Sequence, residues 1–308
     1  MKRVLITGVA GFIGSNLAKS LLAEGYDVIG IDNLYGGTRE NVPSGVKSYV
    51  IDIRGEIRSL FAGVDTVFHL AAKTNLPDCR RDPVAASDVN AGGTVNVLEA
   101  ARVAGVRKFI YADTSAEYEG ITDLPTGVDK ICPISPYAVS KRGGALFCES
   151  YQRLYGMDIT VLRYFNVYGP AQDWRRVFAP VMSAFITKLL RGERPSIYGT
   201  GKKRRDFIYV DDVNALHLRV MQNDHTAGRV YNVGSGINYS VSEIFEMIES
   251  ILKTGLEPIY EADLIGEAEA TLADISDSIR LGWEPRIHLD VGLRRSIEYL
   301  RERVSRES

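Results

Sequence analysis

The stretch KRVLITGVAGFIGSNLAKSLLAEGYDVIGID, residues 2–32, decides the fold of this chain. It opens with an apolar run typical of a short buried strand that ends at Thr7, and a helical run follows over Ser15–Glu24. A second strand, Val28–Ile31, ends at Asp32. Between the first strand and the helix lie glycines with the spacing GxxGxxG. The order of strand, glycine turn, helix and strand predicts a βαβ unit.

Each glycine of this turn has its own expected task. Gly8 allows the tight turn, Gly11 lets the backbone approach a pyrophosphate, and Gly14 lets the helix pack close to the strand. The N-terminus of the helix offers N–H groups and a partial positive charge to phosphates. Asp32 can accept hydrogen bonds from the ribose hydroxyls of an adenosine and repels a 2′-phosphate, so we expect NAD as the cofactor.

Strand-like and helix-like stretches alternate after Asp32, which predicts an α/β fold with a doubly wound Rossmann-type parallel sheet. Strands are expected near 48–51, 66–70, 109–112 and 159–163, and helices over 84–104 and 136–155. From about Asn166 the pattern loosens, with helices expected over 177–191 and 242–253 and a strand leading into a helix over 207–221. We therefore expect an NAD-binding domain over 1–166, with the segment near 207–233 packed on it, and a smaller α/β substrate lobe over 167–308.

Composition excludes several classes of protein. The chain has 308 residues, 45% of them hydrophobic, and a formal net charge of −2, so nothing indicates nucleic acid as a partner. Cys79, Cys132 and Cys148 are too few and too scattered for a disulfide framework or a zinc site, and we expect reduced thiols and no metal. The chain opens directly into a strand and has no long apolar run, so we expect no membrane contact and a cytoplasmic location.

A second informative stretch, residues 135–141, reads Ser-Pro-Tyr-Ala-Val-Ser-Lys. Ser135 followed by proline is a typical helix start, and Tyr137 and Lys141 then share one face of the helix. A nearby ammonium lowers the pKa of a tyrosine, which can then accept a proton from a sugar hydroxyl. Such a pair also occurs by chance on exposed helices, and the glycine turn is what makes it specific.

Other candidate residues follow the predicted strands, where ligands of such sheets gather. Asp52 follows the third strand, where its carboxylate can reach an adenine amino group, and Leu70-Ala71-Ala72 follows the fourth, where small residues let the backbone lie against a cofactor. We interpret His69 as a packed histidine rather than a catalytic one. Thr114 follows the fifth strand and can hydrogen-bond the substrate oxygen that Tyr137 deprotonates.

Taken together, these motifs resemble the extended short-chain dehydrogenase/reductases of the nucleotide-sugar epimerase and dehydratase group, above all the UDP-glucose 4-epimerase family and its UDP-N-acetylglucosamine-specific relatives. The resemblance covers nearly the whole chain. It is carried by the strings at residues 7–14 (TGVAGFIG), 32–34 (DNL), 162–170 (LRYFNVYGP) and 205–212 (RDFIYVDD), together with the Tyr-x-x-x-Lys pair.

The resemblance implies an NAD-dependent nucleotide-sugar 4-epimerase, acting on UDP-glucose/UDP-galactose or UDP-GlcNAc/UDP-GalNAc through a transient 4-keto intermediate. It implies a homodimer formed through the helices near 84–104 and 136–155. The catalytic residues are then Tyr137, Lys141 and Thr114. The cofactor-binding residues are Gly8, Gly11, Phe12, Ile13, Gly14, Asp32, Asn33, Asp52, Ile53, Leu70, Ala71, Ala72, Asn90, Tyr137, Lys141 and Tyr164. The substrate-binding residues are Thr114, Asn166, Val181, Arg205, Glu267 and Thr271.

Departures from the family pattern reduce the number of activities that this chain can have. Relatives that remove water from the sugar carry Asp-Glu where this chain has Ser115-Ala116, so a dehydratase lacks its acid pair. Decarboxylases of the family carry a glutamate at the position of Ala116, and Glu117 stands one position late, which leaves a decarboxylase open. A reductase of the same fold also stays open, whereas a non-catalytic dinucleotide sensor has no need of the catalytic set.

Two further departures concern the substrate. Where the family has arginine in Arg-x-Gly-Asp/Glu, this chain has Leu264, which removes a charged hydrogen bond to phosphate worth about 1.5–3 kcal/mol. Four residues after Glu267 stands Thr271, at a position that borders the 2-substituent of the sugar in the epimerases. Because threonine is small, we hypothesise that an N-acetyl group fits there.

Overall fold

The computed structural model describes residues 2–176, 179–263 and 268–307. For Glu307 it describes the backbone only. The chain divides into two compact units. Unit 1 comprises Met1–Ile121, Val128–Tyr164 and Asn214–Val233, and unit 2 comprises Thr122–Gly127, Phe165–Val213 and Gly234–Ser308. Within the described ranges, no helix is both long and apolar enough to cross a membrane.

Unit 1 is built on a seven-stranded sheet with the order β10-β6-β5-β4-β1-β2-β3. Every neighbouring pair in it is parallel. The strands are β1 (Arg3–Thr7), β2 (Asp27–Asp32), β3 (Lys47–Val50), β4 (Thr66–His69), β5 (Lys108–Thr114), β6 (Asp158–Tyr164) and β10 (Val230–Val233). Apolar runs fill the central strands because both faces are covered. The predicted Rossmann-type fold is confirmed.

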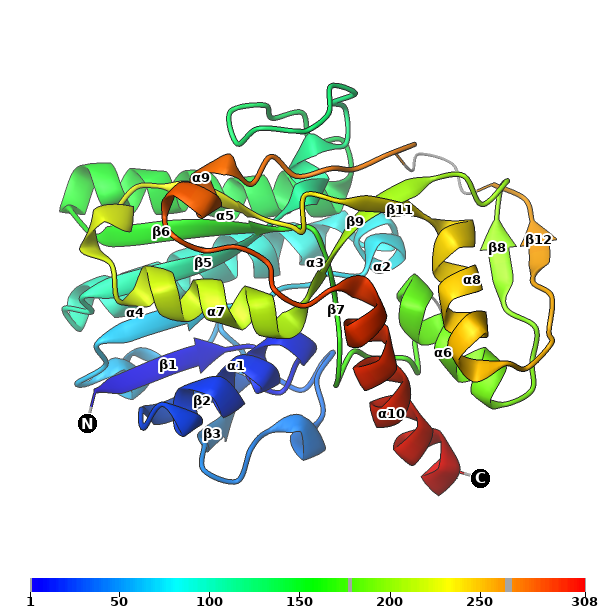
Figure 1. Cartoon of the computed structure of the whole chain (residues 1–308). Coiled ribbons are helices and arrows are strands. Elements are labelled where there is room, and N and C mark those ends of the chain that lie inside the picture. Colours follow the sequence, from blue (N-terminus) through cyan, green and yellow to red (C-terminus); the bar gives the residue numbers. More distant parts are fainter. Residues whose placement is uncertain (1, 177–178, 264–267, 308) are drawn as a thin grey trace. The chain divides into compact units, whose positions relative to one another are not determined.

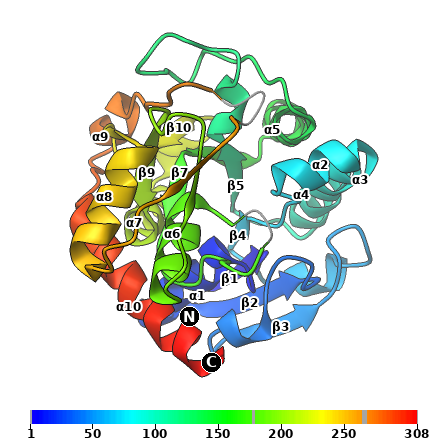
Figure 2. The same cartoon turned by 90° about the vertical axis from the view of Figure 1, so that its right-hand side faces the viewer.

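Helices cover both faces of this sheet. Figures 1 and 2 show α1 (Phe12–Ala23) and α7 (Val210–Met221) on one face and α4 (Thr94–Val103) and α5 (Pro136–Tyr155) on the other; most of α7 belongs to unit 1. The prediction for α5 is correct at both ends, because Ser135 caps its start and Gly156, with φ +66°, ends it in the left-handed conformation.

The predicted long helix over 84–104 is interrupted. The structure has α3 (Pro83–Ser87), a π-helical segment (Asp88–Gly93) and then α4. The hydroxyl of Thr94 donates to the carbonyl of Asn90 at 2.7 Å, and a Cβ on Gly93 would lie 2.6 Å from the side chain of Ile53. The wider turn therefore fits a close packing against the segment after β3, which periodicity alone does not reveal.

Several elements were not predicted. The last strand of the sheet, β10, and the helices α2 (Leu76–Arg81), α9 (Ser276–Arg280) and α10 (Leu289–Glu307) carry weak or mixed patterns. The helix expected over 177–191 is α6 (Val181–Leu190), which begins directly after Pro180. The expected start, Val177, lies outside the described residues.

Unit 2 contains two small sheets. One has the order β11-β9-β7, with β7 (Asn166–Tyr168) parallel and β11 (Asn238–Ser240) antiparallel to β9 (Arg204–Tyr209). The other pairs β8 (Ser196–Tyr198) with β12 (Ile259–Glu261) in parallel. Helices α6, α8 (Val241–Leu252) and α10 pack on one another, and Figure 2 shows them side by side in green, yellow and red. A capping box of Ser240 and Glu243 begins α8.

The glycine turn is held by close backbone contacts. Gly8 has φ +77°, and a Cβ there would lie 2.8 Å from the backbone nitrogen of Ala71. A Cβ on Gly14 would lie 2.1 Å from the carbonyl oxygen of Gly8. Since both neighbours are backbone atoms, neither can move aside without displacing a strand or helix.

We therefore expect Gly14→Ala to lower the free energy of unfolding by about 1–3 kcal/mol or more, because the new methyl overlaps a main-chain carbonyl. Urea unfolding measures this. The matched control is Gly92→Ala, on an exposed helical position whose nearest neighbour is 3.6 Å away, and it should change stability by less than about 1 kcal/mol. Equal midpoints for Gly14→Ala and the wild type would contradict the role given to this contact.

Candidate active site

The start of α1 presents the features expected of a pyrophosphate site. Its N-cap is Gly11, which has no side chain to accept the free N–H groups of the first turn. Gly11, Phe12 and Ile13 are partly exposed, while Gly14 is buried. Gly14 packs so closely on Gly8 that a Cβ there would overlap the carbonyl oxygen of Gly8. The chain is thus shaped here for a dinucleotide rather than for a side chain.

Asp32 stands at the end of β2, half-buried. Its carboxylate accepts hydrogen bonds from the backbone N–H groups of Ala10, at 2.9 Å, and Leu34, at 2.7 Å. Burial raises the pKa of Asp32, and these hydrogen bonds oppose the rise. Each oxygen keeps a further lone pair, so the carboxylate is fixed in place and still able to accept hydrogen bonds from ribose hydroxyls.

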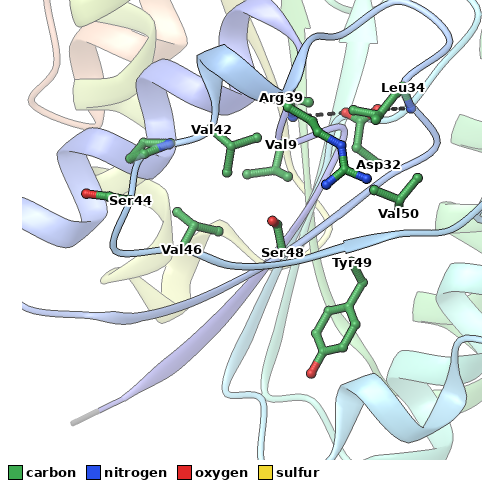
Figure 3. Close-up of a pocket in the computed structure, with 12 residues that line it drawn as sticks. Val9, Asp32, Leu34, Arg39, Val42, Ser44, Val46, Ser48, Tyr49 and Val50 are labelled. Atoms are coloured by element: carbon green, nitrogen blue, oxygen red, sulfur yellow. Dashed lines mark hydrogen bonds between the residues drawn. The ribbon is translucent and has the colours of Figure 1, made fainter.

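A pocket of about 230 Å³ lies beside Asp32, between the turn after β2 and strand β3 (Figure 3). Valines line much of it, and Arg39, Ser44 and Ser48 add polar groups. Arg39 was missed in the sequence because an exposed arginine in a polar turn carries no motif. Its position on the wall of the same pocket as Asp32 makes it a candidate contact for the adenosine end of a cofactor.

The residues after β3 and β4 are also in place. Asp52 accepts hydrogen bonds from Arg54 and, at 2.9 Å, from the amide of Asn33, and the Arg54 guanidinium holds the pKa of Asp52 well below its usual range. Ala71 donates its N–H to the hydroxyl of Thr7 at 3.1 Å, and Leu70, Ala71 and Ala72 are partly exposed. Ile53 is buried beneath the π-helical segment.

Asn90 is buried in that π-helical segment and connects two parts of the site. Its carboxamide accepts from the backbone N–H of Lys73 at 2.7 Å and donates to the Lys73 carbonyl and to the hydroxyl of Ser140 on α5. These bonds join the loop after β4 to the helix that carries Tyr137. Contact with a cofactor, the role expected for Asn90, stays a prediction.

Thr114 ends β5, and Tyr137 and Lys141 lie on α5. Thr114, 9% exposed, hydrogen-bonds the phenol of Tyr137. Lys141 is one helical turn along α5 and 3% exposed, with its Nζ 4.1 Å from the centre of the Tyr111 ring. The Tyr111 hydroxyl donates to the Lys141 carbonyl at 3.0 Å, which fixes the helix on the strand. The structure thus joins Thr114 to Tyr137 and places Lys141 one helical turn further along α5, against Tyr111 of β5.

We expected a lowered pKa for Tyr137 beside Lys141, but in the structure the pKa of Tyr137 is raised, and the causes are burial and neighbouring acids rather than Lys141. Burial raises the pKa of Tyr137 above its ordinary value of 10.0, the hydrogen bond from Thr114 lowers it, and the charge of Asp113 raises it further. Burial also lowers the pKa of Lys141 to about 8, against the charge of Asp113. Desolvation, which sequence spacing does not report, outweighs the attraction between the two groups.

His69 is a packed histidine, as interpreted from the sequence. It is 1% exposed, its Nδ1 is 2.7 Å from the hydroxyl of Thr7 and its Nε2 is 2.9 Å from that of Thr94. Burial lowers the pKa of His69 to about 3, so the ring is neutral and joins β1 to α4. Tyr164, at the end of β6, is buried with its hydroxyl 2.6 Å from Nε2 of His217.

Glu117, which left a decarboxylase open, is fully buried in the turn after Thr114. Its carboxylate pairs with Arg163 at 2.9 Å, and that guanidinium also pairs with Asp113 at 2.9 Å. Because Glu117 is held by a buried cation on the strand β6, it is not free to take the place of a catalytic glutamate at position 116.

Glu119, two residues further, was missed by sequence reasoning. Its carboxylate accepts from the backbone N–H of Ile134 at 3.0 Å, from that of Ser135 at 2.6 Å and from the Ser135 hydroxyl at 2.7 Å. The Ser135 hydroxyl in turn accepts from the N–H of Ala138 and caps α5. The turn after Thr114 therefore holds the start of the helix whose second residue is Tyr137.

Three predicted substrate-binding residues gather around β9 in unit 2. The amide of Asn166 donates to the Asp206 carbonyl at 2.9 Å, and the Thr271 hydroxyl accepts from the Asp206 N–H at 3.3 Å. Arg205 is partly exposed and donates to the Arg204 carbonyl at 3.0 Å. Val181 begins α6, also in unit 2. Glu267 and Leu264 lie outside the described residues.

The hydrogen bonds of Glu119 to Ile134 and Ser135, which we call the clamp on α5, lead to a prediction for stability. Glu119→Ala should cost about 1–3 kcal/mol of unfolding free energy and Ser135→Ala about 1 kcal/mol. Because both remove the same carboxylate–hydroxyl bond, the double variant should lose less than the sum.

Chemical denaturation of the single and double variants measures this coupling. Ser240→Ala, which removes the cap of α8 and shares no partner with Glu119, is the control and should add to Glu119→Ala in full. If the losses of unfolding free energy in Glu119→Ala and Ser135→Ala simply add in the double variant, the clamp does not contribute as a unit.

Known proteins place this arrangement in a family. Residues 4–234 match the NAD dependent epimerase/dehydratase family. A putative UDP-glucose 4-epimerase of Methanocaldococcus jannaschii is 36% identical over 303 residues, which cover 97% of this chain and 98% of the relative. The structure of UDP-glucose 4-epimerase with UDP-glucose from Thermotoga maritima has a TM-score of 0.94 and 35% identity, and the match covers 98% of this chain and 99% of that one.

A further solved structure is UDP-N-acetylglucosamine 4-epimerase from Methanobrevibacter ruminantium in complex with UDP-N-acetylmuramic acid. Its TM-score is 0.94 at 30% identity, and the match covers 98% of this chain and 99% of that one. NAD, the cofactor expected from the glycine turn and Asp32, is confirmed as that of the family. With the matched residues covering most of its length and relatives matched almost end to end, this chain belongs to the NAD dependent epimerase/dehydratase family.

Proposed function

We propose that this chain is an NAD-dependent UDP-sugar 4-epimerase, an isomerase that inverts C4 of the hexose through a transient 4-keto sugar. One observation carries the proposal. Thr114 at the end of β5 hydrogen-bonds Tyr137, and Lys141 lies one turn further along the same helix against Tyr111, in the same unit as a glycine turn that fits a dinucleotide. The family and the epimerases among its relatives support the same activity.

Tyr137 is the proposed general base. The hydrogen bond with Thr114 aligns its phenol and favours its ionised form, so that it can take the proton of the C4 hydroxyl. Thr114 also orients that hydroxyl, and Lys141, as an ammonium, hydrogen-bonds the nicotinamide ribose. When bound, NAD would supply the acceptor for the hydride of sugar C4 and the source that returns it to the opposite face of the keto sugar, and its positive charge would offset the effect of burial on the phenol. Tyr137 then returns the proton to the other epimer.

The alternatives lack the groups that they need. A dehydratase requires an acid pair beside the threonine, and this chain has Ser115 and Ala116 there. A decarboxylase requires a glutamate at the sugar, and Glu117 is buried against Arg163 instead. A reductase of the same fold has no feature in its favour here. Tyr137, at the start of α5, is thus the residue that we propose as the base, and a single base suits a reversible epimerisation.

We also propose distinct roles for the two units. Unit 1 binds NAD through the residues around the glycine turn, Asp32 and the ends of β3 and β4. Unit 2 binds the nucleotide sugar, with Asn166 at the diphosphate, Arg205 on a phosphate and Thr271 beside the 2-substituent of the sugar. An arginine fork suits a phosphate, and Arg205 is partly exposed. The small side chain of Thr271 favours a sugar with an N-acetyl group as well as glucose.

A homodimer in the cytoplasm completes the proposal. On α5 the side chains of Val139, Leu146, Phe147 and Leu154 are 52%, 50%, 42% and 72% exposed, and their spacing puts them on one face. A second copy is the partner that the family resemblance implies, and sedimentation equilibrium tests it. Cys79, Cys132 and Cys148 are free thiols, as is usual in a reducing compartment.

The test of function is incubation of the enzyme with single UDP-, dTDP- and GDP-sugars, with the products resolved by NMR. We expect UDP-hexoses to reach an equilibrium of C4 epimers with no net release of NADH. A stable 4-keto-6-deoxy product or loss of CO₂ would replace the proposal with a dehydratase or a decarboxylase. Turnover of UDP-glucose without turnover of UDP-GlcNAc would overturn the inference from Thr271.

Tyr137→Phe should reduce turnover by about 100- to 10,000-fold, the usual contribution of a general base, while the enzyme still retains NAD. Initial rates and the amount of bound NAD measure the two quantities. Tyr155→Phe is the matched control, since the same hydroxyl is lost from the same helix at a residue that is 53% exposed. Near-normal turnover by Tyr137→Phe would show the mechanism to be wrong.

A further inference from the structure

We propose that Asp113 and Glu117 form a buried carboxyl pair that shares one proton and, through its charge, keeps Lys141 in its ammonium form. Both are positioning residues that act through Lys141. The functional half of this inference rests on the proposed epimerase mechanism, whereas the shared proton is a property of the fold and is testable by itself.

The geometry of the pair calls for a proton. Asp113 is 3% exposed and Glu117 is 0% exposed. One oxygen of each accepts from the guanidinium of Arg163, Oδ2 of Asp113 from Nε and Oε2 of Glu117 from Nη2, each at 2.9 Å. The remaining oxygens, Oδ1 of Asp113 and Oε1 of Glu117, are buried and have no donor among the described residues.

The two carboxyl groups are close enough for Asp113 to raise the pKa of Glu117. Since carboxylate oxygens only accept, a hydrogen bond between the two groups requires that one of them carries a proton. Two carboxylates that share a buried site cannot both ionise readily, because each raises the cost of charging the other. A proton between Oδ1 and Oε1 satisfies both orphaned atoms at once.

The balance of charge agrees. Arg163 is 1% exposed and supplies one buried positive charge against the two carboxyls. Arg142 is the next nearest cation, with Nη1 3.6 Å from Oε2 of Glu117, and its side chain is 30% exposed. Burial and the charge of Asp113 raise the pKa of Glu117 to about 8, against the opposing effects of Arg163 and Arg142. The proton therefore belongs chiefly to Glu117 at neutral pH.

Neutral polar groups complete the surroundings. The hydroxyl of Tyr118 accepts from Nη1 of Arg163 at 2.6 Å and donates to the Asn232 amide oxygen at 2.7 Å, and the Val128 carbonyl accepts from the same Nη1. The other titratable groups whose charges interact with the pair are Tyr111 of β5, Tyr137, Lys141 and Cys148 of α5, and Tyr164 of β6. Lys141 is the one cation in that last group.

Lys141 depends on this charge because the described residues offer it no ion-pair partner. Its Nζ lies over the Tyr111 ring, and within the described ranges it has no carboxylate within ion-pair distance. Burial lowers the pKa of Lys141 to about 8, while Asp113 and, less strongly, Glu117 raise it. As pH rises towards 8, Glu117 loses its proton in the range where Lys141 would lose its own, and the new negative charge holds the ammonium to higher pH.

The first test measures the shared proton without catalysis. Because the folded pKa of Glu117 lies above its ordinary value of 4.5, its contribution to stability is complete below that value and is lost as pH rises towards 8. The Tm of the wild type relative to Glu117→Gln should therefore fall between pH 5 and 8. Tyr118→Phe, which disturbs Arg163 without changing a charge, should track the wild type. A Tm difference for Glu117→Gln that stays constant over this range would overturn the shared proton.

The second test measures the effect on Lys141. The alkaline limb of the kcat/KM profile against pH should move to lower pH by roughly 1 unit in Glu117→Gln and Asp113→Asn, the shift that one nearby charge produces, and should stay in place in Tyr118→Phe. A purely structural role lowers activity at every pH and moves no limb. If Glu117→Gln leaves the limb where it is, the role through Lys141 is wrong even where Asp113→Asn fails to fold. Absence of epimerisation by the wild type itself counts against the proposed function, and the Tm series still decides the proton.

Discussion

The parallel register of three strands is the constraint on which the site depends. Thr7 of β1, His69 of β4 and Tyr111 of β5 lie side by side across the sheet, and the buried imidazole of His69 bridges the hydroxyls of Thr7 and Thr94. Because these strands are parallel and in register, the segments that follow them all begin at the carboxyl-terminal edge of the sheet. That is why the glycine turn, the small residues after His69 and Thr114 lie together, and why Gly8 has no room for a Cβ.

Sequence motifs and local periodicity were enough to predict the fold and part of the candidate site. The glycine turn and the alternation of elements predicted the sheet, and Ser135 and Pro136 predicted the start of α5, because each acts on residues that are close to it in the sequence. The spacing of Tyr137 and Lys141 predicted a shared face. The π-helical segment and the clamp of Glu119 on Ser135 stayed hidden, since both arise from contacts between residues far apart in the sequence.

Electrostatics is where spacing was misleading. The helical spacing suggested that Lys141 lowers the pKa of Tyr137. Both groups are desolvated, however, and burial raises the pKa of Tyr137 and lowers that of Lys141, which favours the neutral form of each. The described residues give Lys141 no ion-pair partner, and the nearby negative charge comes from Asp113, which also opposes ionisation of the phenol. A positive charge beside the phenol, such as that of a nicotinamide, would lower the pKa of Tyr137, as the proposed role of this residue requires.

The acids that follow Thr114 explain how this turn differs from a dehydratase site. In this chain the turn does carry carboxyl groups. Glu117 pairs with Arg163, and Glu119 accepts hydrogen bonds at the start of α5. Each carboxyl group has its own partners, a buried guanidinium for Glu117 and two backbone N–H groups with the Ser135 hydroxyl for Glu119. Ser115 and Ala116 stand where acids act in elimination. Glu119 thus holds the start of the helix that carries Tyr137, and Glu117 is buried against Arg163, so neither acid of the turn is placed for elimination, which agrees with an epimerase.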